Sequence, residues 1–99
     1  MNIQKMMREA QRVQEELQRK LEELRVDGSA GGGMVTAVMD GKKNLLSLAI
    51  SRDAVDPNDL EMLQDLIVAA VASASRRVDE ESQKLMGGLM GGLGIPGLV

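Results

Sequence analysis

Apolar residues recur every three or four positions through the first quarter of the chain, and this spacing restricts the structure that the segment can adopt. They are Ile3, Met6, Ala10, Val13, Leu17, Leu21 and Leu24. At 100° per residue, these positions lie within an arc of about 80° on a helical wheel. The intervening residues are mostly Gln, Glu, Arg and Lys, which favour helix. The pattern predicts one long amphipathic helix over residues 2–25, with an apolar seam along one side.

A glycine-rich segment, DGSAGGG at residues 27–33, ends this helix. Its glycines favour a turn, a bulged strand or a close approach between backbones. A phosphate-binding loop is the alternative interpretation. Such loops lead into a helix and carry Lys with Ser or Thr, whereas this segment leads into the sequence MVTAVMD. We therefore expect the glycines to allow a turn, a bulge or a close backbone approach, and not to bind phosphate.

The next two segments, residues 34–40 and 44–51, have the alternating pattern of a β-hairpin. The apolar residues that share a face are Val35, Ala37 and Met39 on the first segment, and Leu46, Leu48 and Ile50 on the second. The dipeptide Asp40-Gly41 between them is typical of a turn that accepts positive φ. A ribbon of two strands needs a third strand or a covering helix, and residues 26–30 are the candidate for that strand.

A second helix is predicted over residues 57 to about 86. We expect Asp56 to cap its start and Pro57 to occupy its first position, with negative charge following at Asp59 and Glu61. A calcium loop formed by these acidic residues together with Asp53 is the alternative. The segment lacks the central glycine and the distal Glu of such a loop, so capping is the favoured interpretation.

The first half of this second helix is apolar on nearly all sides. One face of a sheet covers only one side of a helix, so a second copy of the chain is expected to cover the remainder. The residues expected in this homodimer interface are Leu66, Ile67, Ala70, Val71 and Ala74. The expected fold class is α+β, with two long helices flanking a small antiparallel sheet.

The chain contains no Cys, His, Phe, Trp or Tyr. Their absence excludes disulfides, thiolate–imidazole zinc sites and catalytic pairs that use Cys or His. It also removes the aromatic side chains on which unstacked bases are bound. No pair of carboxylates lies in a recognisable catalytic frame. We therefore expect a protein that is not an enzyme and that uses no cofactor, no metal and no small-molecule substrate.

The N-terminal segment is charged from residue 5 and lacks the apolar region of a signal peptide. The longest strongly apolar run, residues 66–72, is far shorter than the roughly 20 residues of a membrane span. The absence of Cys fits a reducing compartment. We expect a cytoplasmic protein without a membrane partner.

The net charge is −3, but the basic residues of the first helix gather on one side. Opposite the apolar seam, Lys5, Arg8, Arg12 and Arg19 lie within an arc of about 60°. They could form a solvated face held by local ion pairs such as Lys5–Glu9 and Arg19–Glu23. They could instead bind phosphate. Arg8 and Arg12 are like charges four positions apart, which slightly destabilises the helix, and a bound phosphate would compensate them. The second helix adds Arg76, Arg77 and Lys84, which an antiparallel pairing of the helices would bring toward the start of the first helix.

Six glycines fall within the last thirteen residues, GGLMGGLGIPGLV. Because glycine at this density disfavours regular structure, we expect a dimerising domain over residues 1–86 and a flexible tail over residues 87–99. The alternative is that the apolar residues of the tail dock transiently into a groove.

Several segments of the chain together resemble the YbaB/EbfC family. They are GSAGGGMV at 28–35, the DG turn at 40–41, VDPNDLEMLQDLIVAAVASA at 55–74, the Met-rich opening helix and the ending GGLGIPGL. The resemblance extends over essentially the whole chain and implies an α-β-β-β-α protomer, a tweezer-shaped homodimer and DNA binding in the cytoplasm or on the nucleoid. It carries over no catalytic residue. Many relatives look more basic in the first hairpin strand, where this chain has Thr36, and this departure weakens any contribution of the sheet to DNA contact.

The expected function is that of a nucleoid-associated protein that binds double-stranded DNA mainly through backbone phosphates. Such a protein would organise the nucleoid and regulate gene expression. The expected contact residues are Lys5, Arg8, Arg12, Arg19, Arg76, Arg77 and Lys84. The alternative is a dimeric protein-interaction module that does not bind DNA and uses the apolar tail or the helix grooves.

Overall fold

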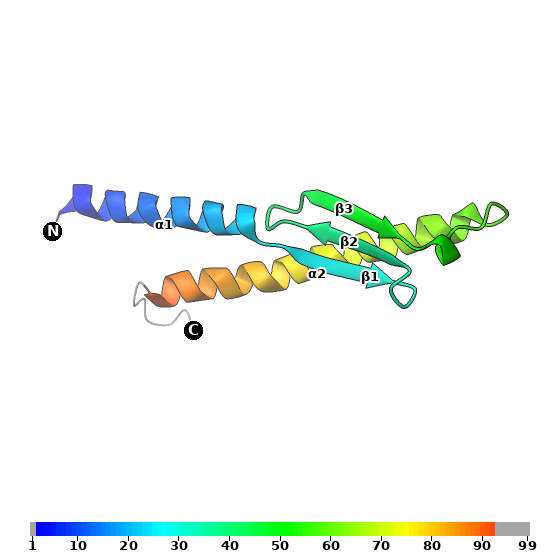
Figure 1. Cartoon of the computed structure of the whole chain (residues 1–99). Helices are drawn as coiled ribbons and strands as arrows, with labels where there is room; N and C mark the ends of the chain where they lie inside the picture. The colour runs from blue at the N-terminus through cyan, green and yellow to red at the C-terminus, as the bar shows by residue number, and fades with distance from the viewer. Residues whose placement is uncertain (1, 93–99) are drawn as a thin grey trace.

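The computed structural model describes residues 2–92 as an elongated protomer of 69 × 23 × 15 Å. Its elements are α1 (Ile3–Glu23), β1 (Val26–Ala30), β2 (Val35–Met39), β3 (Leu45–Ile50), the 3-10 helix η1 (Arg52–Ala54) and α2 (Leu60–Gly92). This order confirms the predicted α+β class and the third strand. The sheet lies along the first half of α2, while α1 and the second half of α2 extend beyond it toward one end of the molecule (Figure 1).

Helix α1 lies within the predicted range and is closed at both ends. The side chain of Asn2 caps its start by accepting a hydrogen bond of 3.1 Å from the backbone N–H of Lys5. The backbone turns to an extended conformation at Leu24. The guanidinium of Arg25 then donates to the carbonyl oxygens of Glu22 and Leu24, at 2.7 and 2.9 Å. The helix therefore ends in a fixed geometry directly before β1.

The three strands form an antiparallel sheet in the order β1-β2-β3, with Ala37 of β2 opposite Gly28 of β1 and Leu48 of β3. The turn between β1 and β2, residues 31–34, contains Gly31, Gly32 and Gly33, all with positive φ. The favoured interpretation of this glycine-rich segment, that it serves the backbone, agrees with the structure.

The hydrophobic core is small and lies between the sheet and α2. Its buried apolar residues are Val26, Val35, Ala37, Met39, Ala54, Ala70, Ala74 and Val78. A Cβ atom built on Gly28 would lie 2.7 Å from the carbonyl oxygen of Ala70 and would also clash with the backbone of Ala74. Both alanines are fully buried within the protomer because β1 packs directly on their helix turn. This corrects the expectation that Ala70 and Ala74 contact a second chain.

Strand β3 is an edge strand, and its apolar side chains remain exposed except for Leu48, which is half-buried and packs against the core. Leu48 and Ile50 lie opposite the buried Ala37 and Val35, so they share the face predicted for them. A register shift places Leu45 opposite Met39, so Leu46 does not continue this face as predicted.

Both ends of α2 differ from the prediction. The helix begins at Leu60, where the side chain of Asp59 accepts a hydrogen bond of 3.1 Å from the backbone N–H of Met62. The predicted cap, Asp56, instead accepts one of 2.9 Å from the backbone N–H of Asn58 in the preceding turn. No group of three or more possible metal ligands occurs within residues 2–92, so the calcium alternative has no support.

At its other end α2 continues to Gly92, past the predicted end near residue 86. Residues 87–92 of the predicted tail are therefore helical, and residues 93–99 lie outside the described residues. Residues that extend an existing helix gain backbone hydrogen bonds without the free-energy cost of helix nucleation. This gain offsets the cost of about 1 kcal/mol for each glycine in the helix. In the part of the chain that the structure describes, neither helix has the length and hydropathy needed to cross a membrane.

Candidate nucleic-acid interface

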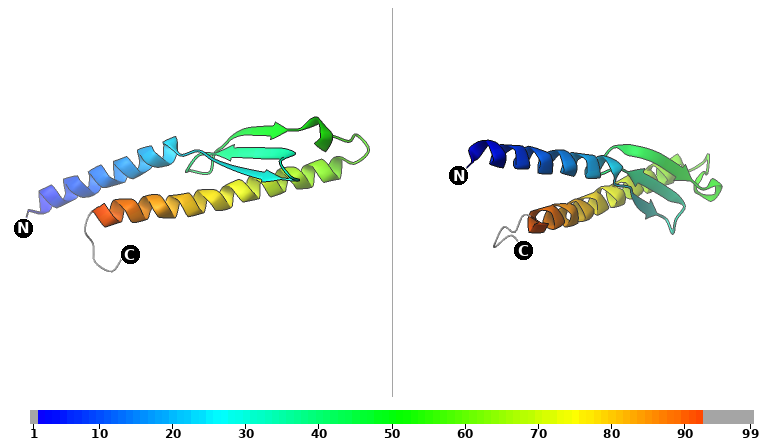
Figure 2. Two further views of the ribbon diagram at one scale, coloured as in Figure 1. Left: turned by 60° about the horizontal axis from the view of Figure 1, so that its bottom comes forward. Right: turned by 60° about the vertical axis from the view of Figure 1, so that its left-hand side comes forward.

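The two helices form a pair of projecting arms. We define the arms as α1 and the part of α2 that follows Val78. Both views in Figure 2 show the arms running antiparallel, with the start of α1 and the end of α2 at the same end of the molecule. This arrangement agrees with the expected antiparallel pairing. Because α1 has no buried residue, its side chains are largely available to a partner.

The start of α1 carries basic side chains that form no ion pair with any residue from 2 to 92. Lys5, Arg8 and Arg12 are exposed and have no salt bridge among the described residues. Of the local pairs considered from the sequence, which also included Arg12–Glu16 and Glu15–Arg19, only Arg19–Glu23 forms among the described residues, with 3.4 Å between nitrogen and oxygen. The predicted basic side of α1 is thus divided. We call Lys5, Arg8 and Arg12 the α1 stripe, and Arg19 lies outside it because its charge is locally compensated.

The predicted basic residues of α2 are divided in the same way. The guanidinium of Arg77 donates to the carbonyl and carboxylate oxygens of Asp27, at 2.6 and 2.8 Å, and so ties α2 to β1. Lys84 pairs with Glu81 at 3.3 Å. Arg76 is exposed and forms no ion pair with any described residue. Since acidic residues occupy positions 79–81, this part of α2 brings no net positive charge to the arms.

Charge is segregated along the long axis of the protomer. Residues 2–14, at the start of α1, contain three basic residues and one acidic residue. Residues 51–66, at the opposite end in Figure 1, contain one basic residue and five acidic residues. A polyanion is therefore attracted to the tip of α1 and repelled from the start of α2, despite the net charge of −3.

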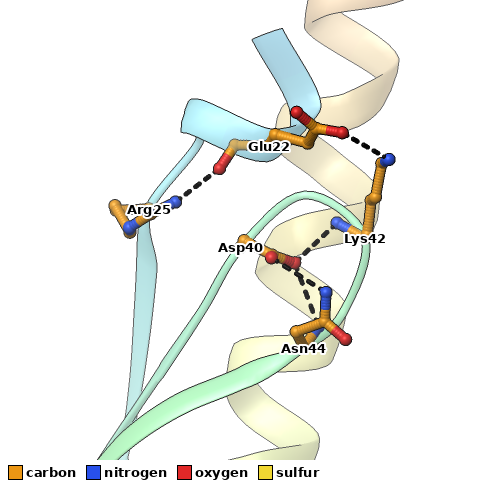
Figure 3. Close-up of polar contacts among 5 residues, drawn as sticks. All are labelled: Glu22, Arg25, Asp40, Lys42 and Asn44. Atoms are coloured by element: carbon orange, nitrogen blue, oxygen red, sulfur yellow. Dashed lines mark hydrogen bonds and ion pairs between the residues drawn. The ribbon is translucent and has the colours of Figure 1, made fainter. Parts of the chain in front are cut away.

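The turn between β2 and β3 holds a network of polar contacts beside the end of α1 (Figure 3). The carboxylate of Asp40 accepts hydrogen bonds from the backbone N–H of Lys42 at 2.9 Å, the backbone N–H of Asn44 at 3.0 Å and the side-chain amide of Asn44 at 3.0 Å. These bonds, that of the Asn44 side chain foremost, hold the pKa of Asp40 below its ordinary value. The charged carboxylate therefore keeps the turn in one conformation.

This turn also contacts both arms, through Gly41 to α1 and through the pairing of Lys43 with Asp79 of α2, which the sequence did not reveal. The backbone N–H of Gly41 donates to the carbonyl oxygen of Leu21 in α1 at 2.8 Å. The positive φ expected in the turn falls on Lys43, at 65°, rather than on the glycine. Gly41 is needed for another reason: a Cβ there would lie 2.6 Å from that carbonyl oxygen. Gly41 itself was the one sign of this contact in the sequence, but its partner, Leu21, lies in a different element and could not be identified from the sequence.

An apolar surface lies apart from the basic one, on β3 and the first half of α2. Leu66, Ile67 and Val71, expected at a dimer interface, are half-buried and pack against the core. The sequence did not assign to a dimer interface the side chains that are most exposed on β3 and the first half of α2. These are Leu45, Leu46 and Ile50 of β3, at 41–48%, with Leu60 and Val68 of α2, at 54% and 67%. We call these five residues the apolar surface.

Comparison with known proteins gives this arrangement a context. The family described as the YbaB/EbfC DNA-binding family matches residues 1–93. A nucleoid-associated protein of Koribacter versatilis is 48% identical over 96 residues, which cover 97% of this chain and 95% of that relative. A nucleoid-associated protein of Clostridium novyi is 48% identical over 101 residues, which cover 99% of this chain and 89% of that relative.

The fold also occurs in a solved structure. The crystal structure of an uncharacterised protein from Helicobacter pylori superimposes on this chain with a TM-score of 0.72 and covers 91% of it. The alignment includes 98% of the Helicobacter chain at 22% sequence identity. The α-β-β-β-α arrangement is therefore shared with a protein of widely different sequence.

Proposed function

Because this chain belongs to the YbaB/EbfC DNA-binding family, we propose that it binds double-stranded DNA through the α1 stripe, mainly by contacts with backbone phosphates. The family is one of DNA-binding proteins and not of enzymes. The observation that carries the proposal is that Lys5, Arg8 and Arg12 are exposed and free of ion pairs among the described residues. Unpaired guanidinium and ammonium groups are the donors that phosphate oxygens accept.

The described residues favour phosphate contact over base reading. The chain has no aromatic side chain to stack on bases. Lys5, Arg8 and Arg12 lie along one side of a single helix, where they form a line of positive charge. Backbone contacts position a protein on a duplex without specifying its sequence. We therefore expect binding to unrelated duplexes with similar affinity, as suits a protein that organises the nucleoid in the cytoplasm and regulates expression broadly.

Of the other expected contact residues, Arg76 is the best supported, since it is exposed and unpaired within residues 2–92. Arg19 and Lys84 would have to leave Glu23 and Glu81, their exposed partners, before binding phosphate. Arg77 would have to leave Asp27. They contribute less than the α1 stripe.

We place a homodimer in the same proposal, with the apolar surface covered by the second chain in a tweezer-shaped assembly. The small size of the protomer core supports it, since the eight buried apolar residues include no side chain larger than Met39. The exposed edge of β3 supports it as well, because an unpaired strand edge with apolar side chains readily joins another chain.

The test is titration of fluorescent duplexes of unrelated sequence with the wild type and the double variant Arg8→Glu/Arg12→Glu. We expect the double variant to lose affinity for every duplex by at least about a hundredfold, because phosphate contact is replaced by repulsion. Arg52→Glu is the matched control. It reverses an exposed charge that forms no ion pair with the described residues, at the acidic end, and should change affinity little.

Salt dependence tests the phosphate contacts separately. Three phosphates neutralised per protomer make about six per dimer, for a slope of log affinity against log salt of roughly −5. A wild type that binds no duplex at low salt would contradict the proposal and favour a protein-interaction module. A preference of about 10³ for one duplex would contradict the backbone-only mode.

A further inference from the structure

We infer that residues 40–44, the turn between β2 and β3, form a clamp that sets the angle between the two arms and thereby positions the α1 stripe on DNA. The inference about the angle stands on the contacts of the turn. Its consequence for DNA rests on the proposed function.

Three consecutive residues of the turn contact two different helices. Gly41 donates its backbone N–H to the carbonyl oxygen of Leu21 in α1 at 2.8 Å. The ammonium of Lys42 pairs with Glu22 of α1 at 2.8 Å. The ammonium of Lys43 pairs with Asp79 of α2 at 3.0 Å. The turn thus links the end of α1 to the middle of α2, in addition to the direct contacts between the two helices.

The turn is stiff enough to act in this way. The carboxylate of Asp40, only 7% exposed, accepts three hydrogen bonds from the residues that follow it (Figure 3). Lys43 is held at φ 65°, in the left-handed region that residues other than glycine rarely adopt. Such a conformation persists where the surrounding contacts determine it. The constrained backbone at Lys43 therefore fixes the direction in which its side chain leaves the turn.

α1 needs such a constraint because its direct contacts with α2 are few compared with those between α2 and the sheet. None of its residues is buried, and only two residues separate it from β1. Its 21 residues make a lever of about 31 Å. A rotation of about 10° at the clamp would move the tip by about 5 Å, more than the rise of about 3.4 Å between successive phosphates on one strand. A small change at Gly41 therefore changes which phosphates Lys5 and Arg8 can reach.

The decisive variant is Glu22→Gln/Asp79→Asn, which removes the ion-pair partners of Lys42 and Lys43 while keeping the shape of both side chains. It also raises the charge by two units per chain. If arm geometry were irrelevant, the added positive charge would strengthen DNA binding. The clamp predicts the opposite, a loss of affinity of about tenfold and a salt slope smaller by about 2 per dimer, because one phosphate contact per protomer is lost.

A second variant, Gly41→Ala, acts on the backbone contact. Its Cβ would lie 2.6 Å from the carbonyl oxygen and 2.8 Å from the Cα of Leu21, so α1 must shift. Gly32→Ala is the control for lost stability. It places a methyl group in open space in the other turn at an unfavourable φ of +66°, without approaching either arm.

Arm geometry is measured directly by spin labels, since the chain has no cysteine of its own. Labels at Gln4→Cys in α1 and Gln83→Cys in α2, both exposed, report the distance between the arms. Dilution with unlabelled protein removes distances between protomers. We expect a single narrow distance peak in the wild type and in Gly32→Ala. In Gly41→Ala and in Glu22→Gln/Asp79→Asn the peak should shift or broaden by several ångströms.

The outcomes separate this inference from the proposed function. Unchanged distances in both clamp variants would overturn the clamp, whatever DNA does. Changed distances with unchanged or stronger DNA binding would overturn the positioning role. A wild type that does not bind DNA would overturn the proposed function and with it the positioning role, while the distances would still decide whether the turn sets the angle.

Discussion

Gly28 of β1 lies so close to Ala70 of α2 that a methyl group on the glycine would be 2.7 Å from the carbonyl oxygen of the alanine. The strand and the helix touch backbone to backbone, and both residues are buried. This contact fixes the sheet on α2 and thereby the point from which both arms extend.

We expect Gly28→Ala to destabilise the protein strongly. The added methyl group meets helix backbone, which cannot rotate away, so the cost should reach about 3 kcal/mol, the upper part of the range for overpacked cores. Gly88→Ala is the matched control, because it lies in α2 with open space around its Cβ position. It should stabilise by about 0.5–1 kcal/mol through helix propensity. Urea unfolding measures the change in unfolding free energy of each variant, which should be a decrease for Gly28→Ala and an increase for Gly88→Ala. Equal changes in the two variants would contradict the close packing.

Stability should fall in acid partly through Asp40. Its pKa in the folded protein is below the ordinary value of 3.8, chiefly through the hydrogen bond from the Asn44 side chain. The stabilisation is therefore fully present above about pH 4 and is lost as pH falls through the lower, folded pKa. Asp40→Asn should show a smaller decrease in unfolding free energy between pH 6 and pH 3 than the wild type. Equal decreases would mean that the carboxylate bonds of the turn do not couple to folding.

Val68→Asp should shift the proposed dimer toward monomer. The side chain is 67% exposed in the protomer, so a carboxylate there leaves the protomer core intact. Covered by a second chain, the same carboxylate would lose its hydration at a cost of several kcal/mol. Ile3→Asp, at a residue 68% exposed near the tip of α1, is the matched control. Light scattering at micromolar concentration distinguishes the species. A wild type that is monomeric there would rule out the dimer.

Truncation after Gly92 should leave the protein folded. The described core lies entirely within residues 26–78. Removing residues 93–99 should change the melting temperature by no more than about 2 °C, since chain ends contribute few fixed contacts. Truncation after Met86 removes six further helical residues and tests whether the end of α2 adds stability. A large decrease in the first truncation would mean that the last seven residues dock on the protein.

The parts of the fold that the sequence predicted depend on local periodicity. The spacing of three and four residues located α1 to within two residues at each end, and alternation located β2 and β3. The start of α2 was misplaced because Asp followed by Pro fits both a turn and the start of a helix, and only the structure shows that Pro57 lies in a turn closed by the Asp59 N–H to Asp56 carbonyl bond. The end of α2 was misplaced because the prediction took the glycines after residue 86 to end the helix, whereas the helix continues through them to Gly92.

The parts that the sequence did not predict depend on contacts between distant residues. A helical wheel placed Lys5, Arg8 and Arg12 on one side of α1, but it could not show that Arg77 is occupied by Asp27, fifty positions away. It also could not show which apolar side of α2 meets β1. The pairing of small residues of α2 with a strand glycine is a contact between distant residues, so the sequence prediction placed Ala70 at a dimer interface instead of in the core of the protomer.

Because one end of the protomer is acidic, ionic strength should act in opposite directions on dimerisation and on DNA binding. Glu61 and Asp65 lie on the same side of α2 as Val68, within an arc of about 60°, so pairing two chains there would bring like charges together. Added salt screens this repulsion and should tighten the dimer, while it weakens the attraction of the α1 stripe for phosphate. Dimerisation and DNA binding should therefore have salt dependences of opposite sign: added salt stabilises the dimer and lowers the affinity of that dimer for DNA.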